Sequence, residues 1–165
     1  MLKWLLILLA VVFVCILVGS FSKIFRLKRN IIESNLSLSV YCKRKETLMD
    51  KITEYLKQRK IAQETGIYEI LEEFRNTKNM SEKVGIGDTF SQKLNELIQK
   101  EYQLRFDAEI MEQITVLKEV DEKIRQSKDK YEISIVSYDV ARKHNILFFL
   151  MPKHKERNDS KVFEE

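Results

Sequence analysis

The segment from Trp4 to Phe21 is eighteen residues long and contains no charged side chain. An α-helix rises about 1.5 Å per residue, so this segment would extend about 27 Å, which is close to the hydrocarbon thickness of a bilayer. We therefore expect residues 1–21 to form an N-terminal transmembrane anchor that contacts the lipid bilayer through residues 4–21.

The cations that flank this segment are distributed unequally. Lys3 and then the aromatic Trp4 stand at its start, whereas four cations follow it, namely Lys23, Arg26, Lys28 and Arg29. The positive-inside rule places the side with more Lys and Arg in the cytoplasm. The sequence thus predicts a single-pass protein of the cell membrane, with its N-terminus outside and the rest of the chain cytoplasmic.

Two other interpretations of this segment compete with the anchor. A cleaved signal peptide combines a basic start, a short apolar region and a small-residue cleavage site. Here Lys3 is the only early cation, Trp4–Val18 is a longer apolar run, and Val18-Gly19-Ser20 is a poor cleavage site. A buried core helix is less favoured still, because a run that is apolar on every face exceeds what a small domain can cover.

The part of the chain after the anchor is highly charged but nearly neutral. It spans 144 residues, which is enough for one domain with a core. Without Lys3, the chain has 28 Lys and Arg against 25 Asp and Glu. A DNA-binding domain usually carries a larger and more clustered excess of cations, so we expect no nucleic-acid partner. The cations just after the anchor instead fit attraction to anionic lipid, at about 1 kcal/mol per residue.

The composition predicts an all-α protein. There is one proline, Pro152, and there are four glycines, while Glu, Lys, Leu, Ile and Gln are frequent. We expect the anchor to be followed by an antiparallel bundle of three to four long helices over residues 22–152. Residues 153–165 would form a polar C-terminal tail. The two cysteines, Cys15 and Cys42, lie on opposite sides of the expected membrane boundary and cannot form a disulfide framework.

The spacing of apolar residues predicts where the helices lie. Apolar positions recur every three or four residues from Ile24 to Phe74, so the first helix can continue directly from the membrane. The pattern weakens between Gln58 and Gly66, where we expect a bend or a frayed end.

The second half of the chain is predicted to start with a long loop. Residues 76–88 contain Gly85 and Gly87 as helix breakers, with Asp88 as the N-cap of a helix from Phe90 to Tyr102. Asp107 is the expected N-cap of a third helix of about forty residues. An apolar run, Ile146–Met151, follows that helix.

Candidate catalytic and metal sites in the sequence do not meet their chemical requirements. Val84–Asp88 lacks the third glycine, the lysine and the preceding strand of a phosphate-binding loop. His144 and His154 have no partner at ligand spacing. Five carboxylates could be imagined as a metal site in the bundle, but they lack the required Glu-x-x-His pairs and are interpreted as solvated: Glu72, Glu73, Asp107, Glu109 and Glu112. We expect no catalytic residue, no cofactor and no metal.

Two further patterns indicate packing or binding surfaces. One helical face contains Tyr131, Ile135 and Tyr138. This face either packs in the core, with the tyrosine hydroxyls reaching water, or binds a partner. A basic turn, Lys43-Arg44-Lys45, leads into an apolar stripe that contains Leu48.

These patterns, in this order, resemble the bacterial LemA family. Its early motif has the form V-x-L-x-R-R-x-x-L-I-P-x-L, and the matching positions are Val40, Lys43, Arg44, Lys45, Leu48, Met49 and Ile52. Lys45 replaces the usual arginine, and Asp50 replaces the usual proline. Glu101-Tyr102-Gln103-Leu104 is similar to a family corner that also contains proline.

The late family motif, R-x-x-Y-N-x-x-V-x-x-Y-N, has its counterpart near the end of the chain. The matching positions are Asp121, Ile124, Tyr131, Ile135 and Tyr138. Glu132 and Asp139 stand where asparagines are expected, which indicates a divergent member. The resemblance implies a membrane-anchored antiparallel bundle of about four helices that has no established biochemical activity, and it supplies no catalytic site.

The sequence leaves three hypotheses about function. The first is a noncatalytic scaffold that presents a helical face to an unknown protein partner at the membrane. The second is a homo-oligomeric coiled coil that serves as a spacer or sensor. The third is an accessory subunit of a membrane enzyme, which would require inward-facing polar residues that the sequence pattern does not reveal.

Overall fold

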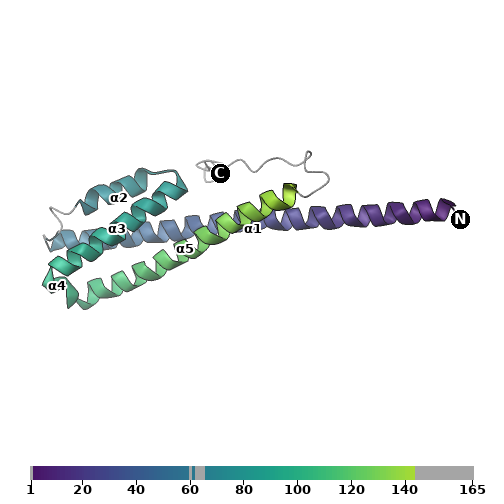
Figure 1. Ribbon diagram of the computed structural model, residues 1–165. Coiled ribbons are helices and arrows are strands. Elements are labelled where there is room, and N and C mark those ends of the chain that lie inside the picture. Colours follow the sequence, from purple (N-terminus) through teal and green to yellow (C-terminus); the bar gives the residue numbers. More distant parts are fainter. Residues whose placement is uncertain (1, 60, 62–65, 144–165) are drawn as a thin grey trace. The chain divides into compact units, whose positions relative to one another are not determined.

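The computed structural model describes residues 2–59, 61 and 66–143 (Figure 1). These residues form helices and, within the described ranges, no strand, which confirms the all-α prediction. The elements are α1 (Leu2–Gln58), α2 (Ile67–Asn76), α3 (Met80–Lys100), α4 (Tyr102–Arg105) and α5 (Ala108–Lys143). The apolar run at 146–151, Pro152, both histidines and the tail at 153–165 lie outside the described residues.

The described chain divides into two units. The first combines the start of α1, residues 2–35, with the end of α5, residues 129–143. The second contains residues 36–128, and so includes the rest of α1 and α5 together with α2, α3 and α4. Each unit has its own apolar core.

Helix α1 continues without a break from the apolar segment at Trp4 into the second unit, as the spacing predicted. It ends at Gln58, where the apolar stripe weakens. Among the residues whose side chains are described, no helix has the length and apolarity needed to cross a membrane.

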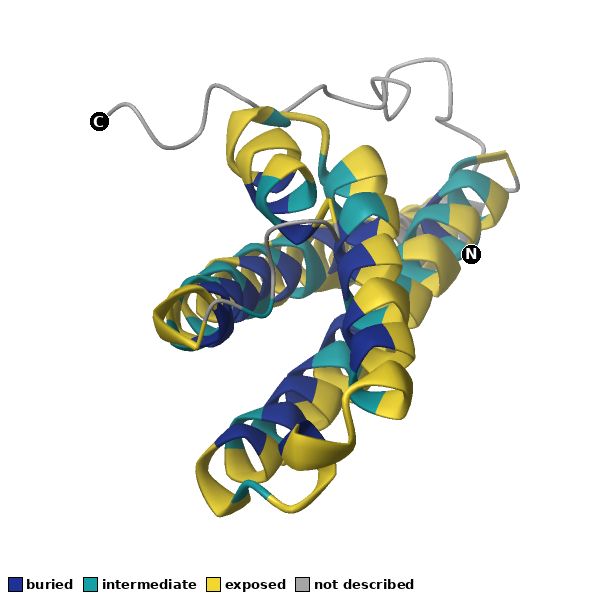
Figure 2. Cartoon of the chain, turned by 90° about the vertical axis from the view of Figure 1, so that its left-hand side faces the viewer, coloured by how far each residue is buried: buried dark blue, intermediate teal, exposed yellow. Residues whose placement is uncertain are grey.

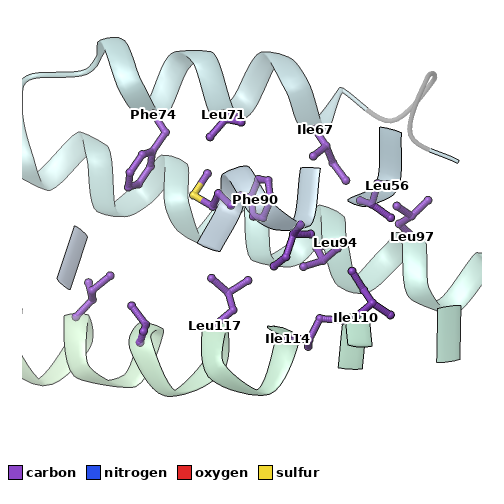
Figure 3. Packing of buried hydrophobic residues seen from close by; sticks show 14 of the residues in the cluster. Leu56, Ile67, Leu71, Phe74, Phe90, Leu94, Leu97, Ile110, Ile114 and Leu117 are labelled. Carbon is purple, nitrogen blue, oxygen red and sulfur yellow. The ribbon is translucent and has the colours of Figure 1, made fainter. Parts of the chain in front are cut away.

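The second unit is built around one core to which α1, α2, α3 and α5 all contribute. Buried positions, dark blue in Figure 2, recur along the helices every three or four residues, as amphipathic helices require. In Figure 3, Leu71 and Phe74 of α2, Phe90 of α3 and Leu117 of α5 all lie in this core. Met49, Ile52 and Leu56 bring α1 into the same core.

The predicted loop at residues 76–88 is wrong. Helix α2 ends at Asn76 and α3 begins at Met80, so the connection is only residues 77–79. Asn79 is the N-cap of α3, and its side-chain oxygen accepts a hydrogen bond of 3.0 Å from the backbone N–H of Ser81. Asp88 therefore lies inside α3 and is not its cap.

The predicted N-cap at Asp107 is confirmed. Its Oδ1 accepts hydrogen bonds from the backbone N–H groups of Glu109 at 3.1 Å and Ile110 at 3.4 Å. Helix α5, which starts directly after it, is 36 residues long, close to the expected length. The short helix α4 occupies the turn before it and buries Leu104.

The core of the first unit joins α1 to α5. Ile24 and Ile31 of α1 and Tyr138 of α5 are buried together, and Tyr131 and Ile135 are partly buried against them. The three residues of the predicted tyrosine face therefore do share one packed surface.

Candidate functional site

The structure places a lysine in the core of the second unit. The side chain of Lys45 is 2% exposed and is among the largest fully buried side chains of the described chain. It faces inward because Cys42, Lys45, Met49 and Ile52 follow one another at steps of three and four on α1, which is the spacing of one helical face.

The ammonium group of Lys45 joins three helices. Its Nζ lies 2.5 Å from Oδ1 of Asp121 on α5 and 4.0 Å from Oδ1 of Asp88 on α3. The other carboxylate oxygen of Asp121 accepts a hydrogen bond of 2.8 Å from the Ser91 hydroxyl on α3. One buried charge is thus compensated by groups from both neighbouring helices.

Gly87 provides the space that this arrangement needs. A Cβ atom at Gly87 would lie 2.9 Å from both Cε and Nζ of Lys45 and 3.1 Å from Cε2 of Phe74. Such distances are shorter than carbon contacts in packed interiors, near 3.5 to 4 Å. The glycine predicted to break the helix instead lies within α3 and lets the lysine side chain approach the helix backbone.

A second ion pair and a buried thiol lie beside this site. Lys83 is 3.3 Å from a carboxylate oxygen of Glu46, and its ammonium lies 4.7 Å from the ring centre of Phe74. Burial raises the pKa of the Cys42 thiol to about 11, although the positive charges of Lys83 and Lys45 oppose that rise. The thiol is therefore protonated at neutral pH, which makes it a poor nucleophile.

Another polar group lies where α1 meets the start of α5. The Tyr55 hydroxyl donates a hydrogen bond to Oδ2 of Asp107, and Arg59 approaches the same oxygen at 2.7 Å. The guanidinium of Arg59 also lies 5.0 Å from the Tyr55 ring centre. The hydrogen bond from Tyr55 is the main cause that lowers the pKa of Asp107. The pKa of Tyr55 is raised, mainly by burial and then by the same hydrogen bond.

The sequence interpretation of Asp107 as a solvated carboxylate is therefore wrong. The other four carboxylates of that set are exposed as predicted. Asp107 differs because it caps a helix and also accepts a hydrogen bond from Tyr55 on α1, and its side chain is only 12% exposed.

The structure brings together two residues of the family-like motifs and separates the others. Lys45 and Asp121 form the ion pair, whereas Lys43 and Arg44 are exposed. Leu48 packs against the core of the second unit, and Ile124 lies within it. Tyr102 is exposed, with its ring centre 4.8 Å from that of Phe106. Tyr131, Ile135 and Tyr138 belong to the first unit.

The residues predicted to flank the membrane anchor are all at the surface. Exposed side chains are found at Lys3, Trp4, Lys23, Arg26, Lys28 and Arg29. Arg29 forms an ion pair of 2.6 Å with Glu33 one turn later on the same helix.

Sequence reasoning missed the inward-facing polar residues. Lys45, Thr53 and Ser127 are buried, although the apolar pattern indicated no polar group inside the bundle. A signal was present, because Lys45 stands in step with Cys42 and Met49 on the apolar stripe. The two cations that precede it, Lys43 and Arg44, make the same residues look like a basic turn.

The chemistry of the site favours a structural role. No group of three His, Cys, Asp or Glu side chains in the described ranges could hold a metal ion. The Lys45 ammonium is directed at carboxylates of its own chain, and it links α1 to α3 and α5. Comparison with known proteins adds no assignment: no family model, curated protein or solved structure matches this chain.

Proposed function

We propose that this chain is a membrane-anchored, LemA-like helical bundle that acts as a noncatalytic scaffold for a protein partner. The observation that carries the proposal is the exposure of large apolar side chains along the start of α1. Val11, Val12, Phe13 and Val14 are each at least 50% exposed, as are Ile7, Leu8 and Leu9 before them.

These side chains cover every face of the helix. Successive residues of an α-helix are rotated by about 100°, so four consecutive exposed apolar residues surround the helix axis. Soluble proteins rarely expose continuous apolar surface of this kind, and such surface marks a membrane or protein contact. The uncharged length of Trp4–Phe21 and the cations behind it favour lipid.

The arrangement of cations supports a cytoplasmic bundle. Four cations follow the apolar segment and one precedes it, so the positive-inside rule directs the N-terminus outside. Because α1 is one helix from Leu2 to Gln58, the anchor and the core of the second unit share a single element. The helical surfaces of the bundle would then be presented to partners at the cytoplasmic face of the membrane.

The ion pair fits a structural role. Lys45, a position of the early motif, contacts Asp121, which lies 76 residues later on another helix. A buried charge that is neutralised within the chain is consistent with a scaffold, because it links helices of the bundle.

Extraction of membranes with alkaline carbonate tests the anchor. We expect the unmodified protein to stay in the membrane pellet and a Val11→Asp/Val12→Asp variant to be released, since each charge at a helix centre costs about 2.5 to 3.5 kcal/mol of insertion free energy. Val40→Asp is the matched control, because Val40 is 57% exposed on the same helix beyond the apolar segment. Release of the unmodified protein would contradict the anchor. If the anchor is confirmed, purification of the full chain from membranes, together with the proteins that accompany it, would identify the partner.

A homo-oligomeric coiled coil is the second candidate, and one surface favours it. Ile133, Val136 and Val140 are at least half exposed on α5, at the i, i+3, i+7 spacing of a coiled-coil seam. If this seam pairs two copies, the protein mass measured in detergent should be that of a dimer. The Val136→Glu variant should then have the mass of a monomer. A monomeric mass for the unmodified chain would exclude this candidate.

A further inference from the structure

Exposed apolar side chains recur along α1 at intervals of seven residues. Two such rows run through the first unit on one uninterrupted helix (Figure 1). The first row has an exposed apolar residue at each successive position: Trp4, Val11, Val18, Phe25 and Ile32. The second row lies three residues further on and comprises Ile7, Val14, Phe21 and the cation Lys28. We call the apolar members of both rows the α1 seam.

The α1 seam extends beyond the wholly apolar segment. Residues 22–35 are mostly polar, and the large apolar side chains exposed there are Phe25 and Ile32, both members of the first row. Each directly follows a residue that is buried against α5, namely Ile24 and Ile31. Neighbouring residues of a helix differ by about 100° around its axis, so the contact with α5 uses another face and leaves the seam uncovered.

The spacing of the α1 seam is that of a coiled coil. Apolar residues separated alternately by three and four positions recur every 3.5 residues on average, and two helices with this repeat wind around each other with their seams in contact. Here the repeat covers four heptads from Trp4 to Ile32, or about 42 Å. Val11, Val18 and Ile32 are β-branched, and β-branched residues in the first row favour a pair of parallel helices.

Two cations lie at the α1 seam. Lys28 occupies one position of the second row, where its aliphatic stem can line the seam while its ammonium reaches water. Arg29 lies beside the seam, and its charge is compensated by Glu33 of the same helix at 2.6 Å. Neither cation therefore has to be buried without a partner when the seam is covered.

The surface of the α1 seam is large enough for a stable contact. Burial of an aromatic side chain covers about 150 to 250 Å². Trp4, Phe21 and Phe25 are 77%, 37% and 68% exposed. These three residues could thus contribute on the order of 300 to 450 Å² of the roughly 800 Å² that each partner buries in a stable interface, and the aliphatic members of the seam add to this area.

We infer that two copies of this chain pair in parallel through the α1 seam. The seam is self-complementary, because each row meets its own counterpart when two such helices lie parallel and in register. This inference rests on the proposed function for that orientation, since two anchors inserted in the same direction in one bilayer are parallel. Within the bilayer the pair is held by van der Waals packing of the seam, and beyond it by the burial of Phe25 and Ile32.

Disulfide cross-linking of the full-length chain in isolated membranes tests this pairing. In a Cys15→Ser background, Phe25→Cys and Ile32→Cys each place a cysteine in the first row, whereas Cys42 is buried and is retained. We expect both variants to form covalent dimers under mild oxidation, because parallel pairing in register brings each cysteine next to its counterpart. Cross-linking at only one of the two positions would overturn the parallel register.

Asn30→Cys in the same background is the matched control. Asn30 is exposed two residues before Ile32, which places it about 200° around the helix from the α1 seam. We expect this variant to remain monomeric on oxidation. Equal yields of dimer at positions 30 and 32 would overturn the pairing, because random collision would then explain both.

The protein mass in detergent distinguishes this pairing from one through α5. We expect Ile32→Glu to convert a dimer into a monomer while the thermal melt of the bundle stays unchanged, since Ile32 is 59% exposed. Asn30→Glu and Val136→Glu should both remain dimeric. A dimeric Ile32→Glu variant together with a monomeric Val136→Glu variant would assign the contact to α5 and contradict the inference.

Extraction of the cysteine variants with alkaline carbonate separates a failure of this inference from a failure of the proposed function. Protein that stays in the membrane pellet but does not cross-link at positions 25 and 32 would overturn the pairing and keep the anchor. Protein that is released but cross-links at both positions would overturn the anchor and keep the pairing.

Discussion

At the scale of single residues, the loss of one partner of the Lys45–Asp121 pair should be the most destabilising polar substitution. Removing one partner of a buried ion pair leaves the other charge uncompensated, which costs about 3 to 5 kcal/mol. Because Lys45 is almost completely buried, we expect Asp121→Ala to lower the free energy of unfolding by that amount in urea titrations. Asp50→Ala is the control, since its ion pair with Arg75 is exposed and should contribute at most about 1 kcal/mol. Equal effects of the two substitutions would contradict the assigned role.

The two glycines of α3 give a matched pair of predictions. A Cβ at Gly85 would meet nothing within 4 Å, so Gly85→Ala should stabilise the helix by about 0.5 to 1 kcal/mol. Gly87→Ala should instead destabilise the protein by about 1 to 3 kcal/mol, because its Cβ would displace a lysine held by Asp121. Thermal or urea unfolding of both variants measures the difference. A gain in stability for Gly87→Ala would show that Lys45 can move without cost.

At the scale of elements, the stability of the start of α5 should depend on pH because of Asp107. Its pKa is lowered in the folded protein, so this carboxylate stabilises the fold above its ordinary pKa near 3.8 and loses that contribution as pH falls further. Asp107→Asn preserves a good N-cap but removes the charge that Tyr55 and Arg59 contact. We expect the variant to be less stable than the unmodified protein at pH 7 and to approach it in acid. A difference in unfolding free energy that stays constant with pH would contradict this role.

The packing of α5 against α1 in the first unit should depend on Tyr138. Truncation of a buried aromatic side chain to alanine costs about 3 to 5 kcal/mol, and Tyr138 is 5% exposed. Tyr138→Ala should therefore accelerate amide hydrogen exchange along residues 129–143. Val136→Ala, at an exposed position of the same helix, should change stability by at most about 0.5 kcal/mol. Unchanged exchange in Tyr138→Ala would favour the alternative that this face binds a partner.

Helix boundaries show which features the sequence could predict. The cap at Asp107 and the end of α1 near Gln58 follow from local signals, namely a capping side chain and a loss of apolar spacing. The prediction of a loop at 76–88 is wrong because Gly87 does not break α3; it leaves room for Lys45, a residue of another helix. The burial of Lys45 has a local signal in its spacing from Cys42 and Met49, but its partner does not: Asp121 lies 76 positions away, and no local pattern carries that information.

At the scale of the whole molecule, the proposed membrane anchor makes orientation important, because the orientation would decide which partners the bundle can meet. A cysteine that replaces Lys78, in the exposed connection between α2 and α3, would report the compartment of the second unit. Cys15 should be replaced by serine, whereas Cys42 can remain because it is buried and its pKa is raised. If the cations after the anchor hold that side in the cytoplasm, a membrane-impermeant thiol reagent should label the new cysteine only after cells are opened.

Reversal of the charge bias completes this test. The variant has lysines added near Met1 and neutral residues in place of Lys23, Arg26, Lys28 and Arg29. We expect its orientation to be inverted or mixed, because membrane insertion resists the translocation of Lys and Arg. The cysteine at position 78 would then become reactive in intact cells. Rapid labelling before the charges are changed would instead place the bundle outside, and partners would have to be sought at the cell surface.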